Sequence, residues 1–104
     1  MAIKPILREE LANSVRMQAA YERELAALPR GSLVQRRIRE RVYWYLVYRE
    51  GKHVRSVYQK SPSPAEIKKY ARAKARRAQY RGNLSKVKKQ IRYLRSILRG
   101  KEPV

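Results

Sequence analysis

The sequence predicts an α+β protein with an N-terminal helix, a three-stranded antiparallel β-meander, and a long C-terminal helix packed antiparallel on the first. Apolar residues recur at helical spacing near both ends of the chain, and β-branched and aromatic residues concentrate in the middle. Prolines and glycines separate these regions. The chain has 104 residues, and we expect residues 1–104 to form a single domain with a modest core.

The first helix is expected over residues 5–28. Pro5 suits a first helical turn, and Pro29 with Gly31 ends the helix. The apolar positions recur at spacings of three or four residues, which is typical of a helix with one buried face. These positions are Leu7, Leu11, Val15, Leu25 and Leu28, with Gln18 and Tyr21 or Glu22 filling the gap between Val15 and Leu25.

A β-meander is expected over residues 32–60, with turns at Glu40-Arg41 and Glu50-Gly51. Gly51 supports the second turn because glycine adopts positive φ without steric cost. The first turn contains no such residue.

The second helix is expected over residues 64–99. Ser63 as N-cap, Pro64 as first helical residue and Glu66 three positions after the cap form a capping box. Two alternatives are open at Gly82-Asn83: the helix kinks or breaks there, or it continues unbroken to Arg99. A strict 4-3-4-3-4 apolar spacing predicts a seam against another helix. This seam consists of Tyr80, Leu84, Val87, Ile91, Leu94 and Leu98.

The length of the turns decides which residues of the middle strand face the core. Two-residue turns place on one face Val34, Ile38, Tyr43, Tyr45, Val47, Val54 and Tyr58. Three-residue turns place together Val34, Ile38, Trp44, Leu46, Tyr48, Val54 and Tyr58. Both sets are credible cores, so Val54 and Tyr58 are expected inside in either case. We favour Trp44 and Leu46 inside, because Arg49 then faces outward with Tyr43 and Tyr45.

Charge is the strongest signal of function. The 27 Lys and Arg against 8 acidic residues give a net charge of +19. Residues 1–30 carry +1, residues 31–60 carry +6, and residues 61–104 carry +12. A basic block this dense repels itself unless a polyanion neutralises it, which indicates nucleic acid as the partner.

The candidate binding residues belong to the sheet and to the second helix. An aromatic ring flanked by cations on a sheet suits base stacking or a groove, and rows of cations on a helix suit phosphates. The sheet candidates are Arg37, Arg39, Tyr43, Tyr45, Arg49, Lys52, His53 and Arg55. The helix candidates are Lys68, Lys69, Arg72, Lys74, Arg76, Arg77, Arg81, Lys88, Arg92 and Arg95. The alternatives are that the rings pack under the helices and that the cations form a solvated helix face.

Other classes of function find little support in the sequence. His53 is the one histidine, and the chain has no Cys and no Asp, so neither a catalytic triad nor a metal-ligand set is expected. We therefore expect no enzyme activity, no cofactor and no metal. No stretch approaches the roughly 18 apolar residues of a membrane span, so a cytoplasmic location on nucleoid or ribonucleoprotein is expected. The competing class is an interaction protein or a mobile-element regulator or inhibitor that binds a ribonucleoprotein or an acidic protein. The apolar faces of the helices and the sheet are expected to pack on each other or, in a homodimer, on a second copy.

The stretch from Leu28 to Tyr58 resembles a family of small uncharacterised prokaryotic proteins with charged helices flanking a Tyr-rich meander. The shared pattern begins Leu-Pro-x-Gly-Ser-Leu and continues through a Tyr-rich strand that ends Tyr-Arg-Glu-Gly. The matching residues are Leu28, Pro29, Gly31, Ser32, Leu33, Ile38, Tyr43, Tyr45, Leu46, Tyr48, Arg49, Glu50, Gly51, Lys52, Val54, Arg55, Ser56 and Tyr58.

Two departures from the family pattern concern the turns. The family has Gly in the first turn, where this chain has Arg39-Glu40-Arg41, and a further Gly in the second turn that is absent here. Longer turns are therefore expected. The Tyr-rich hairpin is also distantly similar to the N-terminal sheets with which some transposases and tyrosine integrases grip DNA, and this similarity favours DNA as the partner.

Overall fold

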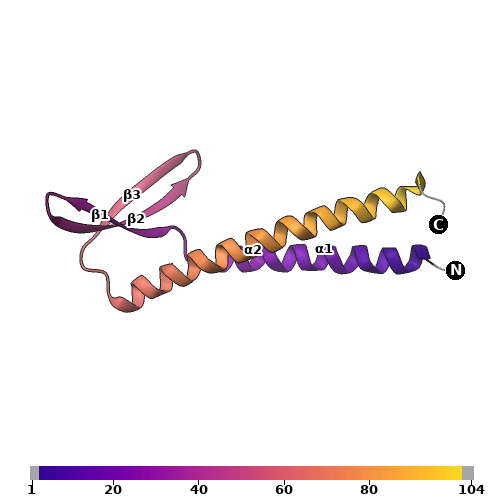
Figure 1. Ribbon diagram of the computed structural model, residues 1–104, viewed down its shortest axis with the longest axis horizontal. Coiled ribbons are helices and arrows are strands. Elements are labelled where there is room, and N and C mark those ends of the chain that lie inside the picture. The colour runs from indigo at the N-terminus through magenta and orange to yellow at the C-terminus, as the bar shows by residue number, and fades with distance from the viewer. Residues whose placement is uncertain (1–2, 102–104) are drawn as a thin grey trace. The chain divides into compact units, whose positions relative to one another are not determined.

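A computed structural model describes residues 3–101 of the chain. In order along the chain its elements are α1 (Ile3–Ala27), β1 (Ser32–Ile38), β2 (Arg41–Glu50), β3 (His53–Gln59), α2 (Pro64–Ser96) and a π-helical turn, η1 (Ile97–Lys101) (Figure 1). The α+β fold predicted from the sequence is confirmed. The chain divides into two compact units. The helical unit comprises residues 3–27 and 78–101, and the sheet unit comprises Leu28–Arg77.

The helical unit pairs α1 with the C-terminal part of α2. The rings of Tyr21 and Tyr80 lie 6.2 Å apart between centroids, and α1 also contacts η1. The predicted antiparallel packing of the two helices is therefore confirmed. Its best-buried apolar residues are Val87, Ile91 and Leu94, each at most 5% exposed. All three belong to the seam predicted from the 4-3-4-3-4 spacing.

The buried face of α1 differs from the predicted face at one position. Ser14 is 2% exposed, whereas Val15 is 41% exposed, so the expectation that Val15 lies in the core is wrong. Ser14 comes seven residues before Tyr21, and Val87 comes seven after Tyr80, so antiparallel packing sets Ser14 opposite Val87. The covered residues of α1 then repeat the 4-3-4-3-4 spacing of α2. The residues in this repeat are Leu7, Leu11, Ser14, Gln18, Tyr21 and Leu25, and Lys4 and Ala20 are also half-buried.

The sheet unit contains an antiparallel meander in the order β1-β2-β3. Its turns are Arg39-Glu40 and Gly51-Lys52, with two residues each. Both lie one residue from their predicted positions, and the expectation of longer turns is wrong. Arg39 and Glu40 take φ values of 52° and 72°, which are the left-handed values that a tight hairpin turn requires. The first turn therefore stays short without a glycine.

The pairing fixes which side chains share a face, because directly opposed residues of neighbouring strands point the same way. Val34 and Tyr58 both pair with Tyr45, as the two-residue turns require. We name the two faces after their aromatic residues. The tyrosine face carries Ser32, Val34, Arg36, Ile38, Arg41, Tyr43, Tyr45, Val47, Arg49, Val54, Ser56 and Tyr58. The tryptophan face carries Leu33, Gln35, Arg37, Val42, Trp44, Leu46, Tyr48, Glu50, His53, Arg55, Val57 and Gln59.

The tyrosine face is not the core. Val54 is 62% exposed and Tyr58 is 53% exposed, so the expectation that both lie inside is wrong. On β2, residues of both faces are half-buried, Trp44 and Leu46 on one and Tyr43 and Tyr45 on the other, so neither face forms a closed core. The physical reason is that a three-stranded sheet has too little material to cover both faces, so its apolar pattern does not by itself identify a core.

The segment that leads into β1 is fixed against β2 and α2. A Cβ atom on Gly31 would lie 2.6 Å from the Val47 carbonyl oxygen and 3.2 Å from Leu46 Cδ1. From the helix side, the Arg77 guanidinium donates hydrogen bonds to the carbonyl oxygens of Pro29, at 2.8 Å, and Gly31, at 3.5 Å. Gly31 therefore has no room for a side chain.

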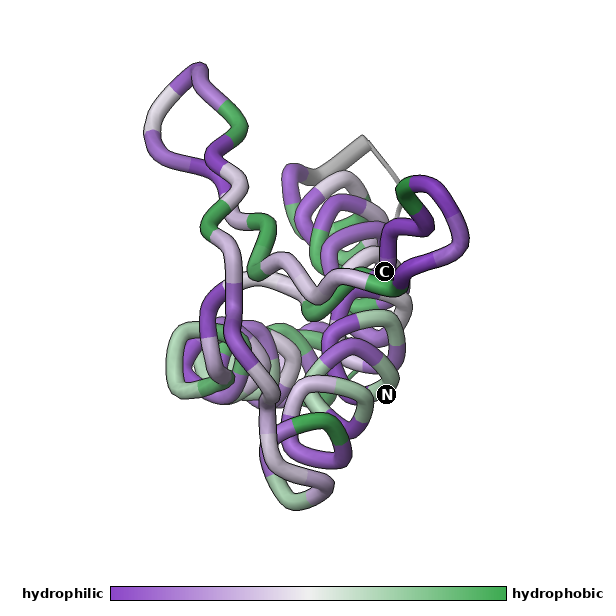
Figure 2. Tube along the Cα trace, turned by 90° about the vertical axis from the view of Figure 1, so that its left-hand side faces the viewer, coloured by the Kyte–Doolittle hydropathy of each residue, from purple (hydrophilic) through white to green (hydrophobic). Residues whose placement is uncertain are grey.

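The start of α2 follows the predicted cap. The backbone N–H of Glu66 donates to Ser63 Oγ at 3.1 Å, and that hydroxyl donates to the Glu66 carboxylate at 3.3 Å. The helix continues through Gly82 and Asn83 to Ser96, so the alternative of a break there is wrong. Hydrophobic residues occur singly or in short runs along the trace (Figure 2). Among the helices in residues 3–101, none has the length and apolar character needed to cross a membrane.

The strained first turn leads to a stability prediction. Left-handed backbone costs an ordinary residue about 1–2 kcal/mol, and Asn-Gly is the preferred sequence for such a turn. We expect Arg39→Asn with Glu40→Gly to raise the free energy of unfolding by about 1 kcal/mol, measured by thermal melts followed by circular dichroism. The control is Lys52→Gly, where φ is not positive and glycine should destabilise. An unchanged or lower midpoint for Asn-Gly would contradict the strain.

Candidate nucleic-acid interface

Three tyrosines form a cluster on the tyrosine face of the sheet. The ring of Tyr58 lies 6.1 Å from that of Tyr43 and 5.8 Å from that of Tyr45, the second pair edge to face. The Arg36 guanidinium lies over the Tyr45 ring, 4.9 Å from its centroid, and is 3.4 Å from the hydroxyl of Ser56. The rings thus hold one another and one cation in place across all three strands.

The surroundings of this cluster are basic and open. Arg36, Arg41 and Arg49 are exposed on the same face, and none of the described strand residues of this face is acidic. Tyr43 and Tyr45 are half-buried, whereas Tyr58 is more than half exposed. Aromatic rings between cations can stack on bases while the cations approach phosphate.

The sheet candidates from the sequence do not share one surface. Tyr43, Tyr45 and Arg49 lie on the tyrosine face, whereas Arg37, His53 and Arg55 lie on the tryptophan face. Arg39 and Lys52 lie in the two turns. The two-residue turns cause this division, because a change of one residue in register moves the whole middle strand to the other face.

On the tryptophan face, the one ion pair reported among the described residues joins Arg55 to Glu50 at 3.5 Å, with both side chains more than half exposed. Such a pair contributes little to stability and leaves both charges in contact with solvent.

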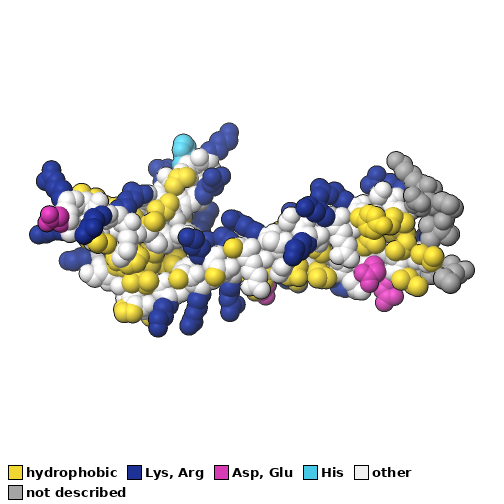
Figure 3. All heavy atoms as spheres, viewed as in Figure 1, with side chains coloured by type: hydrophobic (Ala, Val, Ile, Leu, Met, Phe, Trp, Pro, Cys, Tyr) yellow, Lys and Arg dark blue, Asp and Glu magenta, His cyan; other side chains and the backbone are white. Residues whose placement is uncertain are grey.

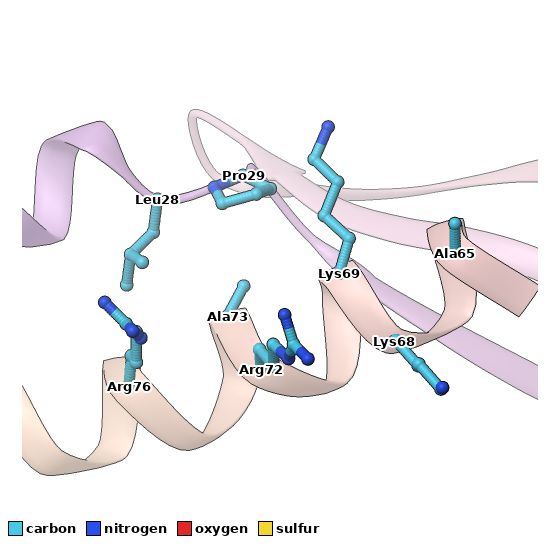
Figure 4. Close-up of a pocket in the computed structure, with 8 residues that line it drawn as sticks. All are labelled: Leu28, Pro29, Ala65, Lys68, Lys69, Arg72, Ala73 and Arg76. Atoms are coloured by element: carbon cyan, nitrogen blue, oxygen red, sulfur yellow. The ribbon is translucent and has the colours of Figure 1, made fainter.

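Within the sheet unit, the first half of α2 carries a basic hollow with a volume of about 420 Å³. Its apolar lining comes from Leu28, Pro29, Ala65 and Ala73, and its cations are Lys68, Lys69, Arg72 and Arg76. In Figure 4, Leu28 points toward Arg76, whereas Lys68 and Lys69 extend away on opposite sides of the helix. None of these eight described residues is acidic. The hollow therefore presents Arg72 and Arg76 beside a small apolar surface.

Arg77 has a structural role that the pattern of charges along the sequence did not indicate. Its guanidinium is half-buried and bonded to the Pro29 and Gly31 carbonyl oxygens. A hydrogen bond from a charged donor contributes about 1.5–3 kcal/mol to stability. Arg77 thus ties the segment before β1 to α2, and it is the one candidate of the helix that is not exposed.

In the helical unit, α2 continues to present cations and no acids. Arg81, Lys88 and Arg92 surround a shallow hollow of about 330 Å³ that Leu84 and Ser85 also line. Arg95 is exposed further along the helix, and Lys74, near the end of the sheet unit, is exposed as well. On the face shown in Figure 3, Lys and Arg side chains are spread over helices and strands, whereas Asp and Glu side chains occur in few places.

Sequence reasoning missed three residues of the tyrosine face. Tyr58 was expected in the core, and neither Arg36 nor Arg41 was a candidate. Arg36 pairs directly with Tyr43 and Tyr58 with Tyr45, and Arg41 lies two residues before Tyr43 on β2. The sequence held one signal for Arg36, because Val34, Arg36 and Ile38 are spaced two residues apart and so share one face of β1. Only the observed register shows that this face also carries the tyrosines.

The fold and this surface define a small basic α+β protein in which the β-meander follows one charged helix and precedes another along the chain. The chain belongs to the family described as a domain of unknown function, DUF6788, whose model matches residues 6–69. The match contains the whole Leu28–Tyr58 stretch, so the expected membership of an uncharacterised family is confirmed. No curated protein and no solved structure matches the chain.

Proposed function

We propose that this protein binds nucleic acid, with the cations of α2 contacting phosphates and the meander approaching bases or a groove. One observation carries the proposal: from Lys68 to Arg95, α2 contains no acidic residue, and every cation except Arg77 is exposed. Solvated helix faces usually mix both signs of charge, because like charges four residues apart destabilise a helix. A polyanion removes this repulsion.

The hollows on α2 support phosphate contact in particular. Arg72 and Arg76 are one helical turn apart and line the same hollow, so both guanidinium groups can approach one stretch of backbone. Arginine binds phosphate through two parallel N–H donors, which gives geometric preference as well as charge. The apolar surface of Leu28 and Pro29 beside them suits the sugar.

DNA is slightly favoured over RNA in this proposal. This preference rests on the sequence-based expectation that the Tyr-rich hairpin acts like the DNA-gripping sheets of some transposases and tyrosine integrases. A cytoplasmic site of action on the nucleoid or on a ribonucleoprotein belongs to the same proposal.

Steep salt dependence is the expected result of a binding titration. Each phosphate neutralised on duplex DNA lowers log K by about 0.9 per unit of log salt, because condensed counterions are released. We expect a slope equivalent to about five or more phosphates for a labelled duplex measured by fluorescence anisotropy over a salt series. Tight binding that does not change with salt would contradict the phosphate mechanism.

A further inference from the structure

We infer that the tyrosine face is a stacking platform for unpaired bases, so that the protein prefers single-stranded nucleic acid to a duplex. This inference rests on the proposed function and names its ligand class. The central observation is the cluster of Tyr43, Tyr45 and Tyr58, with Arg36 held over one ring.

The rings are arranged for a ligand more than for a core. Tyr58 is 53% exposed, and its neighbours on the face, Val34, Ile38 and Val54, are 39%, 47% and 62% exposed. Exposed apolar residues grouped in this way mark a binding surface. Rings fixed by edge contacts lose little conformational freedom when a base stacks on them.

The charge of the face decides between occupants. Arg36, Arg41 and Arg49 lie among the tyrosines, and the whole chain carries +19. A second copy would bring the same three arginines to the same contact, so a symmetric dimer through this face is disfavoured by repulsion. A nucleic-acid strand supplies flat bases that can stack on the tyrosine rings and phosphates that can neutralise the arginines.

Unpaired bases fit this face better than paired ones. In a duplex the flat surfaces of the bases are stacked on one another, and only their edges are open in the grooves. Tyrosine has no fork of donors for reading base edges, whereas its ring matches the face of any base. The expected preference is therefore for strand type and not for sequence.

The test compares labelled single-stranded DNA, single-stranded RNA and duplex DNA of equal length by fluorescence anisotropy at one salt concentration. The variant is Tyr45→Leu with Tyr58→Leu, which keeps apolar side chains on the strands. We expect about a tenfold loss of affinity for single strands, corresponding to about 1.4 kcal/mol, and less than about a twofold change for the duplex. The two single-stranded arms show whether the platform prefers DNA or RNA.

The matched control is Tyr93→Leu, which removes a tyrosine 65% exposed on α2, outside the cluster. Its affinity for every ligand should equal that of the parent. Equal losses for single strands and duplex in the sheet variant would overturn the inference. So would unchanged single-strand affinity, including the case in which the sheet variant instead loses a dimer seen by light scattering. A parent chain that binds no nucleic acid at all would refute the proposed function itself.

A second measurement on the unmodified chain covers the case in which the sheet variant fails to fold. A single strand containing 5-iodouracil is irradiated with the protein, because this base crosslinks to a ring stacked on it, and the adduct is located by mass spectrometry. Crosslinks at Tyr43, Tyr45 or Tyr58 are expected. Crosslinks confined to Tyr70, Tyr80 or Tyr93 of α2 would overturn the inference.

Discussion

Replacing Arg72, Arg76 and Arg81 with glutamine is expected to weaken nucleic-acid binding by about 100-fold at low salt. All three are exposed on α2 and line its two hollows. The salt slope should fall by about one for each phosphate contact removed. Because glutamine is nearly as good a helix former as arginine, the unfolding midpoint should change little. Fluorescence anisotropy and thermal melts measure the two results.

A control variant that loses three positive charges elsewhere separates the effect of net charge on binding from the effect of where the charges lie. Arg8, Arg16 and Arg23 are exposed on α1, where acidic residues accompany them, and we expect their replacement by glutamine to weaken binding by less than about threefold. Equal effects of the two triple variants would show that the general positive field binds the nucleic acid and that α2 has no special part. Arg77 is left unchanged in both variants, because its bonds to Pro29 and Gly31 support the fold.

Gly31→Ala is expected to be the most damaging single substitution in the sheet unit. Its φ is +90°, and the new Cβ would lie 2.6 Å from a backbone oxygen of β2 and 3.0 Å from Tyr48 Cβ. Backbone atoms cannot rotate away, so the segment must leave both β2 and the carbonyl contacts of Arg77. We expect a loss of about 3 kcal/mol in the free energy of unfolding, measured by urea denaturation.

Two other glycines provide controls for this substitution. Gly51 has a φ of +61° but nothing within 4 Å of its added Cβ, so Gly51→Ala should cost only the backbone strain, about 1 kcal/mol. Gly82 lies in α2 with open space around it, and Gly82→Ala should stabilise by about 1 kcal/mol. Equal urea midpoints for Gly31→Ala and Gly51→Ala would show that the close approach of Gly31 to β2 does not affect the cost of adding a side chain.

The helices were predictable because their signals are local. The cap at Ser63 lies directly before α2, and the repeat that starts at Tyr80 runs along α2 and ends at Leu98 in the adjoining η1. Ser14 escaped notice because a small polar residue does not enter an apolar pattern. It became recognisable only when Tyr21 and Tyr80 set the alignment of the two helices.

The sheet was less predictable because its signals depend on distant partners. The strands and their order follow from composition, but the phase of β2 depends on two turns. The first turn keeps two residues only because Arg39 and Glu40 accept left-handed backbone. The role of Arg77 likewise depends on a contact with Pro29, 48 residues away in the sequence, and charge patterning alone groups it with the other cations.

The most direct test of nucleic-acid binding is an equilibrium titration of the full chain at low salt against labelled single-stranded DNA, duplex DNA and structured RNA. We predict a Kd of about 1 μM or below for at least one of them, a value typical of basic proteins that bind phosphate backbones. Absence of binding to all three at about ten times that concentration would contradict the account.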